Sequence, residues 1–222
     1  MTEEKTPKIV NAKLTFVDQL KAWHANPLRQ HYIDLFEQEL LATKRPGIQD
    51  LLDDLKIPDC SGPNAYCFYD QPASTKFHGN ELGGLAKHCI AVFTHLNMFV
   101  TQFKLTMEKD SIAIVALLHD LCKWNTYRPV VTLKGILSEG KTPFVVEDII
   151  ALGHGEESII RIMEYIPLTP EEKIMIRWHM GNYDFDYTWK NYQYKVKERC
   201  PATIYLQLAD QLAAVSEGES DE

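Results

Sequence analysis

Apolar residues recur every three or four positions along most of this chain, which is the spacing of an amphipathic helix. Near the beginning, the pattern covers residues 14–55 and is interrupted at Pro27 and at Arg45-Pro46-Gly47. Proline and glycine disfavour a continuous helix, so these breaks separate shorter helices. We therefore predict an N-terminal helical arm over residues 1–60. It leads into a loop rich in Pro, Gly, Ser and Asn that ends near residue 80.

Helical spacing returns after this loop and continues almost to the end of the sequence. The segments that show it are residues 83–103, 110–123, 156–165, 169–181 and 202–215. Between the second and the third of them, residues 127–133 and 143–146 resemble the two strands of a small β-hairpin. The stretch 182–200 is aromatic and polar, and no element is assigned to it.

The predicted fold is therefore all-α, with one small β-hairpin placed after a long apolar helix. The main domain is expected to cover residues 61–215, behind the N-terminal arm. An acidic tail over residues 216–222 is expected to be disordered, because it has too few apolar residues to bury.

Composition and charge narrow the classes of protein that fit. The chain has 222 residues, of which 45% are hydrophobic, so it can bury a substantial core. Lys and Arg number 23 and Asp and Glu number 31, which gives a net charge of −8. A net acidic chain argues against binding to long nucleic acid, which needs a face that neutralises phosphates.

The cysteines point to a reducing compartment. There are five of them and no CxxC motif, a pattern that fits neither a disulfide framework nor a thiolate zinc site. No signal-peptide pattern is present at the N-terminus, and no apolar run approaches the length of a membrane span. We therefore expect a cytoplasmic protein with reduced thiols and no membrane partner.

The feature that most needs a chemical explanation is the pair His119-Asp120. An apolar run over residues 112–118 leads directly into it, and Lys123 follows three residues after the aspartate. Polar groups at the end of a buried helix need a partner, and a divalent cation is the simplest one. Imidazole and carboxylate together suit Mn, Fe, Co, Ni or Zn better than Ca or Mg.

Further His and Asp residues lie on or beside apolar helical segments or Gly-rich bends elsewhere in the chain. With the first pair they form a candidate ligand set: His88, His119, Asp120, His154, His179 and Asp210. Taken singly, each has a structural explanation; His88 fits a hydrogen-bonded core histidine, and Asp210 fits a carboxylate paired with an arginine. Together they favour a metal site, because burying two unpaired carboxylates costs several kcal/mol.

The order His … His-Asp … Asp resembles the signature of the HD-domain superfamily of metal-dependent phosphohydrolases, over residues 72–215. His88, His119-Asp120 and Asp210 match its ligand positions, and Lys123 matches a lysine that often follows the His-Asp pair. His154 and His179 look like the two extra histidines of binuclear members. Those members include cyclic-dinucleotide phosphodiesterases, dinucleoside tetraphosphate hydrolases and diiron oxygenases.

Two departures from these relatives are visible in the sequence. The GYP motif of the cyclic-dinucleotide phosphodiesterases is absent. The stretch from His78 through Gly83-Gly84-Leu85 to His88 also looks like the HD part of a bacterial 3′–5′ exoribonuclease, but the OB-fold module of that enzyme is not evident.

The resemblance implies an HD-domain helical bundle with two divalent transition-metal ions (Mn, Fe, Ni, Co or Zn). Asp120 would bridge the ions, with His88, His119 and Asp210 completing one and His154 and His179 the other. Asp120 and Lys123 are then the candidate catalytic residues. Lys123 alternatively fits an exposed cation at a helix end.

Candidate substrate-binding residues are those whose side chains could bind phosphate oxygens: Lys76, His78, Lys87, Arg128 and Arg177. Each of them singly also fits an ordinary surface residue. The stretch 72–80, which holds two of them, fits equally a capped turn before a helix or a loop that contacts substrate.

Three functions remain open at this point. The first is a metal-dependent phosphohydrolase that cleaves a phosphoester or phosphodiester of a nucleotide or short nucleic acid, which fits a small phosphorylated partner. The second is a diiron oxygenase of the same superfamily. The third is a non-catalytic helical protein whose metal is structural.

Overall fold

The computed structural model describes residues 14–58, 65–75, 79–132, 144–147, 152–181 and 190–218. Over these residues the chain is mostly helical, with one short antiparallel hairpin after the helix that leads into His119-Asp120. The prediction of an all-α fold with a small β-hairpin at this position is therefore confirmed.

Three helices form the N-terminal part: α1 (Phe16–His24), α2 (Pro27–Ala42) and α3 (Ile48–Leu55). The Thr15 hydroxyl accepts a hydrogen bond from the backbone N–H of Asp18 and so caps α1. Pro27 occupies the first turn of α2, where its missing N–H costs nothing. Gly47, at φ 87°, provides the left-handed turn that starts α3. The predicted helix breaks at Pro27 and around Gly47 are confirmed.

The remaining helices and strands follow in the order expected from the sequence. They are η1 (Phe68–Asp70), α4 (Gly84–Phe103), α5 (Lys109–Leu118), η2 (Leu121–Lys123), β1 (Tyr127–Pro129), β2 (Phe144–Val146), α6 (His154–Met163), α7 (Pro170–Arg177), α8 (Lys190–Arg199) and α9 (Ala202–Gly218). The strands pair antiparallel, with Arg128 opposite Val145.

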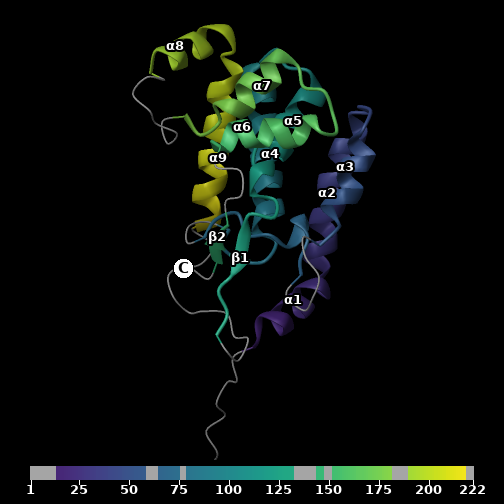
Figure 1. Cartoon of the computed structure of the whole chain (residues 1–222). Coiled ribbons are helices and arrows are strands. Elements are labelled where there is room, and N and C mark those ends of the chain that lie inside the picture. The colour runs from purple at the N-terminus through teal and green to yellow at the C-terminus, as the bar shows by residue number, and fades with distance from the viewer. Residues whose placement is uncertain are drawn as a thin grey trace, which may run out of the picture.

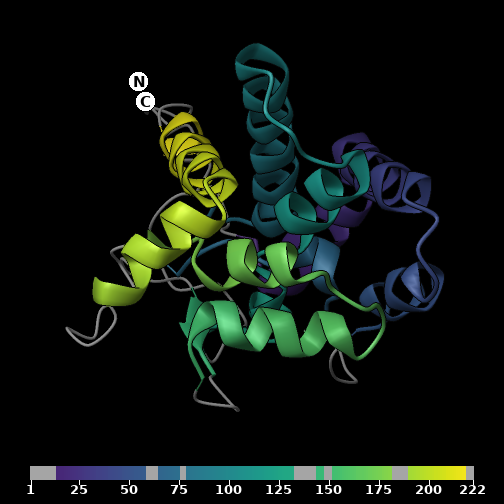
Figure 2. The same cartoon turned by 90° about the horizontal axis from the view of Figure 1, so that it is seen from above.

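Helix α4 is central to the fold. Figure 1 shows it between α9 on one side and α2 and α3 on the other, and the view from above in Figure 2 agrees. α5 packs against α4, while α6 and α7 lie against each other. Of the elements that carry candidate ligands, α5 and α9 therefore pack directly against α4, which carries His88.

One hydrophobic core joins α2 and α3 to the rest of the fold, and the buried residues of α1 belong to a second cluster. Phe36 from α2, Leu52 from α3, Val92 from α4 and Val115 from α5 are all fully buried in the same cluster. Burial of such side chains is worth about 2 kcal/mol each. The predicted boundary at residue 60 lies outside the described residues, so the division of the chain there stays a prediction.

Asp70 connects the N-terminal helices to the main domain through a buried polar cluster. Its carboxylate accepts hydrogen bonds from Arg29 Nε at 2.7 Å, from Trp23 Nε1 at 3.1 Å and from the backbone N–H of Cys67 at 3.1 Å. His24 Nε2 lies 3.2 Å away. Burial opposes ionisation of Asp70, but Arg29 and the Cys67 N–H hold its pKa below the ordinary value.

We expect Asp70→Asn to lower the free energy of unfolding by about 3 kcal/mol at pH 7, because Arg29 keeps its charge without a counter-ion. The pKa of Asp70 is lowered by folding, so this stabilisation is present at neutral pH and is lost as the pH falls through the native pKa. Urea unfolding of wild type and variant should therefore show a difference that shrinks in acid. Asp34→Asn, on the exposed face of α2, is the control. Equal effects of the two substitutions at pH 7 would contradict the prediction.

The structure differs from the sequence expectation at three places. The helix predicted over residues 110–123 ends at Leu118, and a short 3-10 turn, η2, follows. Helix α8 lies in the stretch to which no element was assigned. Helix α9 extends to Gly218, into the segment expected to be a tail, and residues 219–222 lie outside the described residues.

None of the helices in the described part of the chain is long and apolar enough to cross a membrane.

Candidate metal centre

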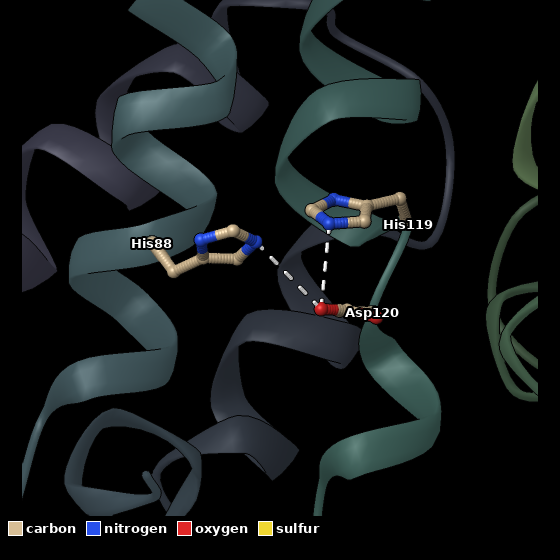
Figure 3. Close-up of side chains that lie close together, drawn as sticks. All are labelled: His88, His119 and Asp120. Atoms are coloured by element: carbon tan, nitrogen blue, oxygen red, sulfur yellow. Dashed lines mark ion pairs between the residues drawn. The ribbon is translucent and has the colours of Figure 1, made fainter. Parts of the chain in front are cut away.

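Four segments far apart in the sequence bring five of the six predicted ligands together. His88 comes from α4, His119 and Asp120 from the end of α5, His179 from just beyond α7, and Asp210 from α9. Figure 3 shows His88 and His119 directed toward the carboxylate of Asp120. All of them except Asp210 are at most 2% exposed, so the cluster is a core feature of the protein.

The end of α5 explains how two adjacent residues reach one site. His119 is the last residue with helical dihedral angles, and Asp120 leaves the helix at φ −104° and ψ 22°. In a continuous helix, neighbouring side chains diverge by about 100°. The break therefore lets both His119 and Asp120 face the centre.

The distances within the cluster suit a shared cation. His88 Nε2 lies 3.0 Å from Asp210 Oδ1, and His119 Nε2 lies 3.4 Å from Asp120 Oδ2. His179 Nε2 lies 3.5 Å from Asp120 Oδ1. Metal–ligand bonds of about 2.0–2.2 Å place neighbouring ligand atoms about 3.0–3.5 Å apart, so these separations match the edges of a coordination polyhedron.

Two of the imidazoles are held in the tautomer that a metal requires. His119 Nδ1 lies 2.8 Å from the carbonyl oxygen of Ala116, and His179 Nδ1 lies 2.7 Å from that of Ile176. A carbonyl can only accept, so each Nδ1 carries the hydrogen. This leaves both Nε2 atoms free to act as ligands.

The polar atoms of the cluster that are buried without a hydrogen-bond partner include His119 Nε2, His179 Nε2 and Asp120 Oδ1. An unsatisfied buried polar atom costs about 1–3 kcal/mol, and a charged one costs more. A cation between them would satisfy all three at once. The donor set, two imidazoles and a carboxylate, is one that transition metals prefer.

The local charges favour ionised carboxylates. Burial opposes ionisation of Asp120, but the ammonium of Lys123, 2.6 Å away, and the imidazoles of His119 and His179 lower its pKa well below the ordinary value. Burial likewise opposes ionisation of Asp210, and the hydrogen bond with His88 and the nearby imidazoles lower its pKa. Both carboxylates are thus in the form that binds a cation.

His154, the sixth predicted ligand, lies in a neighbouring group. Its Nδ1 is 3.3 Å from Sγ of Cys122, and these two residues form a close set of donors with Asp120. Meanwhile His179 forms such a set with His119 and Asp210. Asp120 therefore lies next to both groups, as a bridging ligand would.

Gly155 allows this neighbouring group to form. A Cβ atom on Gly155 would come within 2.5 Å of the Arg177 carbonyl oxygen, so only glycine lets the first turn of α6 approach the end of α7. This contact brings His154, the first residue of α6, beside the centre. The glycine that follows His154 is thus explained by close packing.

A pocket of about 360 Å³ opens beside the centre. Its walls include Lys123, His154, the thiol-bearing Cys122 and the hydroxyl-bearing residues Ser74 and Thr75. Small-molecule sites are typically concave volumes of about 300–1,000 Å³ with a few polar groups. The pocket is therefore large enough for a small ligand next to Lys123 and His154.

Two of the predicted substrate-binding residues lie outside the part of the chain that the structure describes, and two others form ion pairs with glutamates. Lys76 and His78 lie outside the described residues. Lys87 Nζ is 3.4 Å from Glu81 Oε1, and Arg128 Nε is 2.8 Å from Glu147 Oε2. Their roles toward a substrate stay predictions.

The side chain of Arg177 contacts two other side chains of the protein, those of Glu156 and Trp178. It forms an ion pair with Glu156, and its guanidinium carbon lies 4.6 Å from the centre of the Trp178 ring. The cation–π contact and the ion pair both fix the end of α7, close to His179. A role in substrate binding stays a prediction for this residue as well.

Cys122 was not predicted as a ligand from the sequence, because the cysteines form no CxxC motif. It is nevertheless only two residues from Asp120. The thiol is 3% exposed, and burial together with the charge of Asp120 raises its pKa to about 12. Its position between the His-Asp pair and Lys123 was the available signal.

No family model, curated protein or solved structure matches this chain. The described structure defines a helical protein with a buried His/Asp cluster, and an adjoining His/Asp/Cys group, that could hold metal ions.

Proposed function

We propose that this protein is a metal-dependent phosphohydrolase of the HD type, which cleaves a phosphoester or phosphodiester of a small nucleotide-like substrate. The observation that carries the proposal is a set of three potential metal-ligand atoms that are buried without a hydrogen-bond partner, on His119, Asp120 and His179. They lie close to a pocket that Lys123 lines. The imidazoles lie 3.4 and 3.5 Å from the Asp120 carboxylate without forming hydrogen bonds to it, whereas a purely structural cluster would be expected to close these contacts into hydrogen bonds.

The residues that would hold a first ion are those whose donor atoms converge: His88, His119, Asp120, His179 and Asp210. Ions bound here would supply Lewis acidity toward phosphoryl oxygens and would lower the pKa of water enough to give a nucleophile near neutral pH. The protein's own contribution is to fix the ligands before substrate arrives. The Nδ1 hydrogen bonds of His119 and His179 to backbone carbonyls do this.

The position and the charge of Lys123 support a role for this residue in phosphate binding. Its Nζ lies 2.6 Å from Asp120 Oδ2, and it also lines the pocket. Burial opposes its charge, but Asp120 raises the pKa of Lys123, so the ammonium stays protonated at neutral pH. When cations neutralise Asp120, this ammonium can turn its hydrogens toward a phosphate oxygen at the same site.

The hydroxyl-bearing residues Ser74 and Thr75 also line the pocket, and a hydroxyl is a neutral donor for phosphate oxygens. The net charge of −8 disfavours a long polyanion and leaves a small phosphorylated molecule as the better substrate. A nucleotide or short phosphodiester fits a pocket of this volume.

The proposal is tested by phosphate release from nucleotides and from bis(p-nitrophenyl) phosphate, with protein loaded in turn with Mn, Fe, Co and Zn. We expect hydrolysis that chelation abolishes and that added metal restores. Metal-loaded protein that hydrolyses none of the panel would contradict the proposal. Oxygen consumption in place of hydrolysis would favour the oxygenase chemistry instead.

A further inference from the structure

Cys122 and His154 form a second group of donors that the five-residue cluster does not use. Sγ of Cys122 lies 3.3 Å from Nδ1 of His154. The ligand atoms of Cys122, His154 and Asp120 all lie within 4.8 Å of one another. Asp120 is common to both groups, and its Oδ1 has no hydrogen-bond partner although the residue is only 2% exposed.

The sulfur of Cys122 and the nitrogen of His154 are at hydrogen-bond distance, and this separation also suits two ligands of one metal ion. With a metal–sulfur bond of about 2.3 Å and a metal–nitrogen bond of about 2.0 Å, a tetrahedral ion places the two atoms about 3.5 Å apart. The observed 3.3 Å is close to this value. The two side chains therefore need little movement to share an ion.

The backbone holds Cys122 in this position. Its N–H donates to Oγ of Ser158 on α6 at 3.1 Å, and its carbonyl oxygen accepts from Oγ1 of Thr126 at 2.6 Å. Ser158 belongs to the same helix as His154, so η2 and α6 are fixed to each other at the site. The cysteine and the histidine are thus placed in advance, as ligands of a metal site are.

The group also has an open side. Cys122 and His154 both line the pocket of about 360 Å³, and His154 is exposed there. An ion held by three protein ligands would face the pocket with its remaining position. Such an open position is typical of catalytic rather than structural metal sites.

We propose that Asp120, Cys122 and His154 form a second metal site whose thiolate selects a thiophilic ion such as Zn, Co or Fe(II) over Mn or Mg. The Sγ–H bond of Cys122 is replaced by an Sγ–metal bond, and the proton leaves to solvent. Soft thiolate ligands favour these ions, whereas oxygen ligands favour Mn and Mg. The site adjoins that of the proposed function through Asp120, but its existence does not require hydrolysis.

The experiment is an anaerobic titration of the metal-free full-length protein with Co(II), followed by absorption spectroscopy. Thiolate bound to Co(II) gives a near-ultraviolet charge-transfer band that nitrogen and oxygen ligands do not give. We expect this band in the wild type, with about two Co(II) bound per chain. Added Zn should remove the band, and added Mn should not.

Three variants complete the test. Cys122→Ser and His154→Ala should each lower the bound Co(II) from about two to about one per chain, and Cys122→Ser should also lose the charge-transfer band. Cys200→Ser is the matched control, because Cys200 is another buried cysteine, between α8 and α9 and outside the three-residue group. This variant should keep the band. Circular dichroism identifies any variant that fails to fold, and Cys122→Ala then replaces it.

A wild type that binds Co(II) without the band, or that binds none, would overturn the second site. A band that persists in Cys122→Ser would do the same. The outcome is separate from that of the proposed function. A band without any phosphate release would refute the hydrolase and keep the site, and hydrolysis without a band would refute the site and keep the hydrolase.

Discussion

Asp120→Asn is expected to remove both the bound metal and more than about 99.9% of the hydrolytic activity, on the order of a 1,000-fold loss. Asp120 belongs to the His/Asp cluster and also to the group that it forms with Cys122 and His154. Within the cluster, its Oδ1 lies 3.5 Å from His179 Nε2 and its Oδ2 lies 3.4 Å from His119 Nε2. An amide keeps the shape of the side chain but provides one neutral oxygen and one nitrogen donor. It can therefore neither bridge two ions nor balance their charge.

The helices should survive this substitution, because the core around α4 and α5 is apolar and does not depend on the carboxylate. Metal content by elemental analysis, phosphate release and circular dichroism are measured together. Asp50→Asn, in the exposed first turn of α3, is the control for a general loss of negative charge. An Asp120→Asn protein that keeps its metal and full turnover would remove Asp120 from the site.

Lys123→Met is expected to lower kcat/KM by about 100-fold while leaving the metal content unchanged. The ammonium lies 2.6 Å from Asp120 Oδ2, and Lys123 lines the pocket. Because the ammonium is positively charged, it repels a metal ion and cannot be one of its ligands. Methionine keeps the length of the side chain and loses the cation that would bind a phosphate oxygen. Metal affinity should not fall, because the ligands remain.

Kinetics with bis(p-nitrophenyl) phosphate and elemental analysis of the same preparation distinguish a role of Lys123 in phosphate binding from a role in holding Asp120 in place. Lys21→Met, on the exposed face of α1, is the control and should behave as wild type. If Lys123→Met lost its metal together with its activity, Lys123 would be a structural partner of Asp120. If it kept full activity, Lys123 would be only the counter-ion of the metal-free protein.

Most of the fold could be predicted from the spacing of apolar residues, because helices that bury one face repeat at that spacing. Helix α8 could not, since residues 190–199 are strongly polar and carry no apolar stripe. The early end of α5 was also missed. The apolar run continues up to His119, and the change in backbone angles at Asp120 leaves no mark in the hydrophobic pattern.

The residues of the candidate site could be predicted because buried His and Asp are costly without a partner. Their grouping could not. His88 and Asp210 are 122 positions apart in the sequence, yet His88 Nε2 lies 3.0 Å from Asp210 Oδ1 because α4 packs against α9. In the same way, His154 comes beside Cys122 because α6 packs on η2, a contact that no local pattern in the sequence encodes.

The central claim is that the buried His/Asp cluster binds transition metal. The most direct test is elemental analysis of metal per chain in protein purified without added metal or chelator, for wild type and Asp120→Asn side by side. We predict about two transition-metal ions per chain in the wild type and close to none in the variant. A wild type that carries no metal, and takes up none on reconstitution with Mn, Fe, Co or Zn, would contradict it.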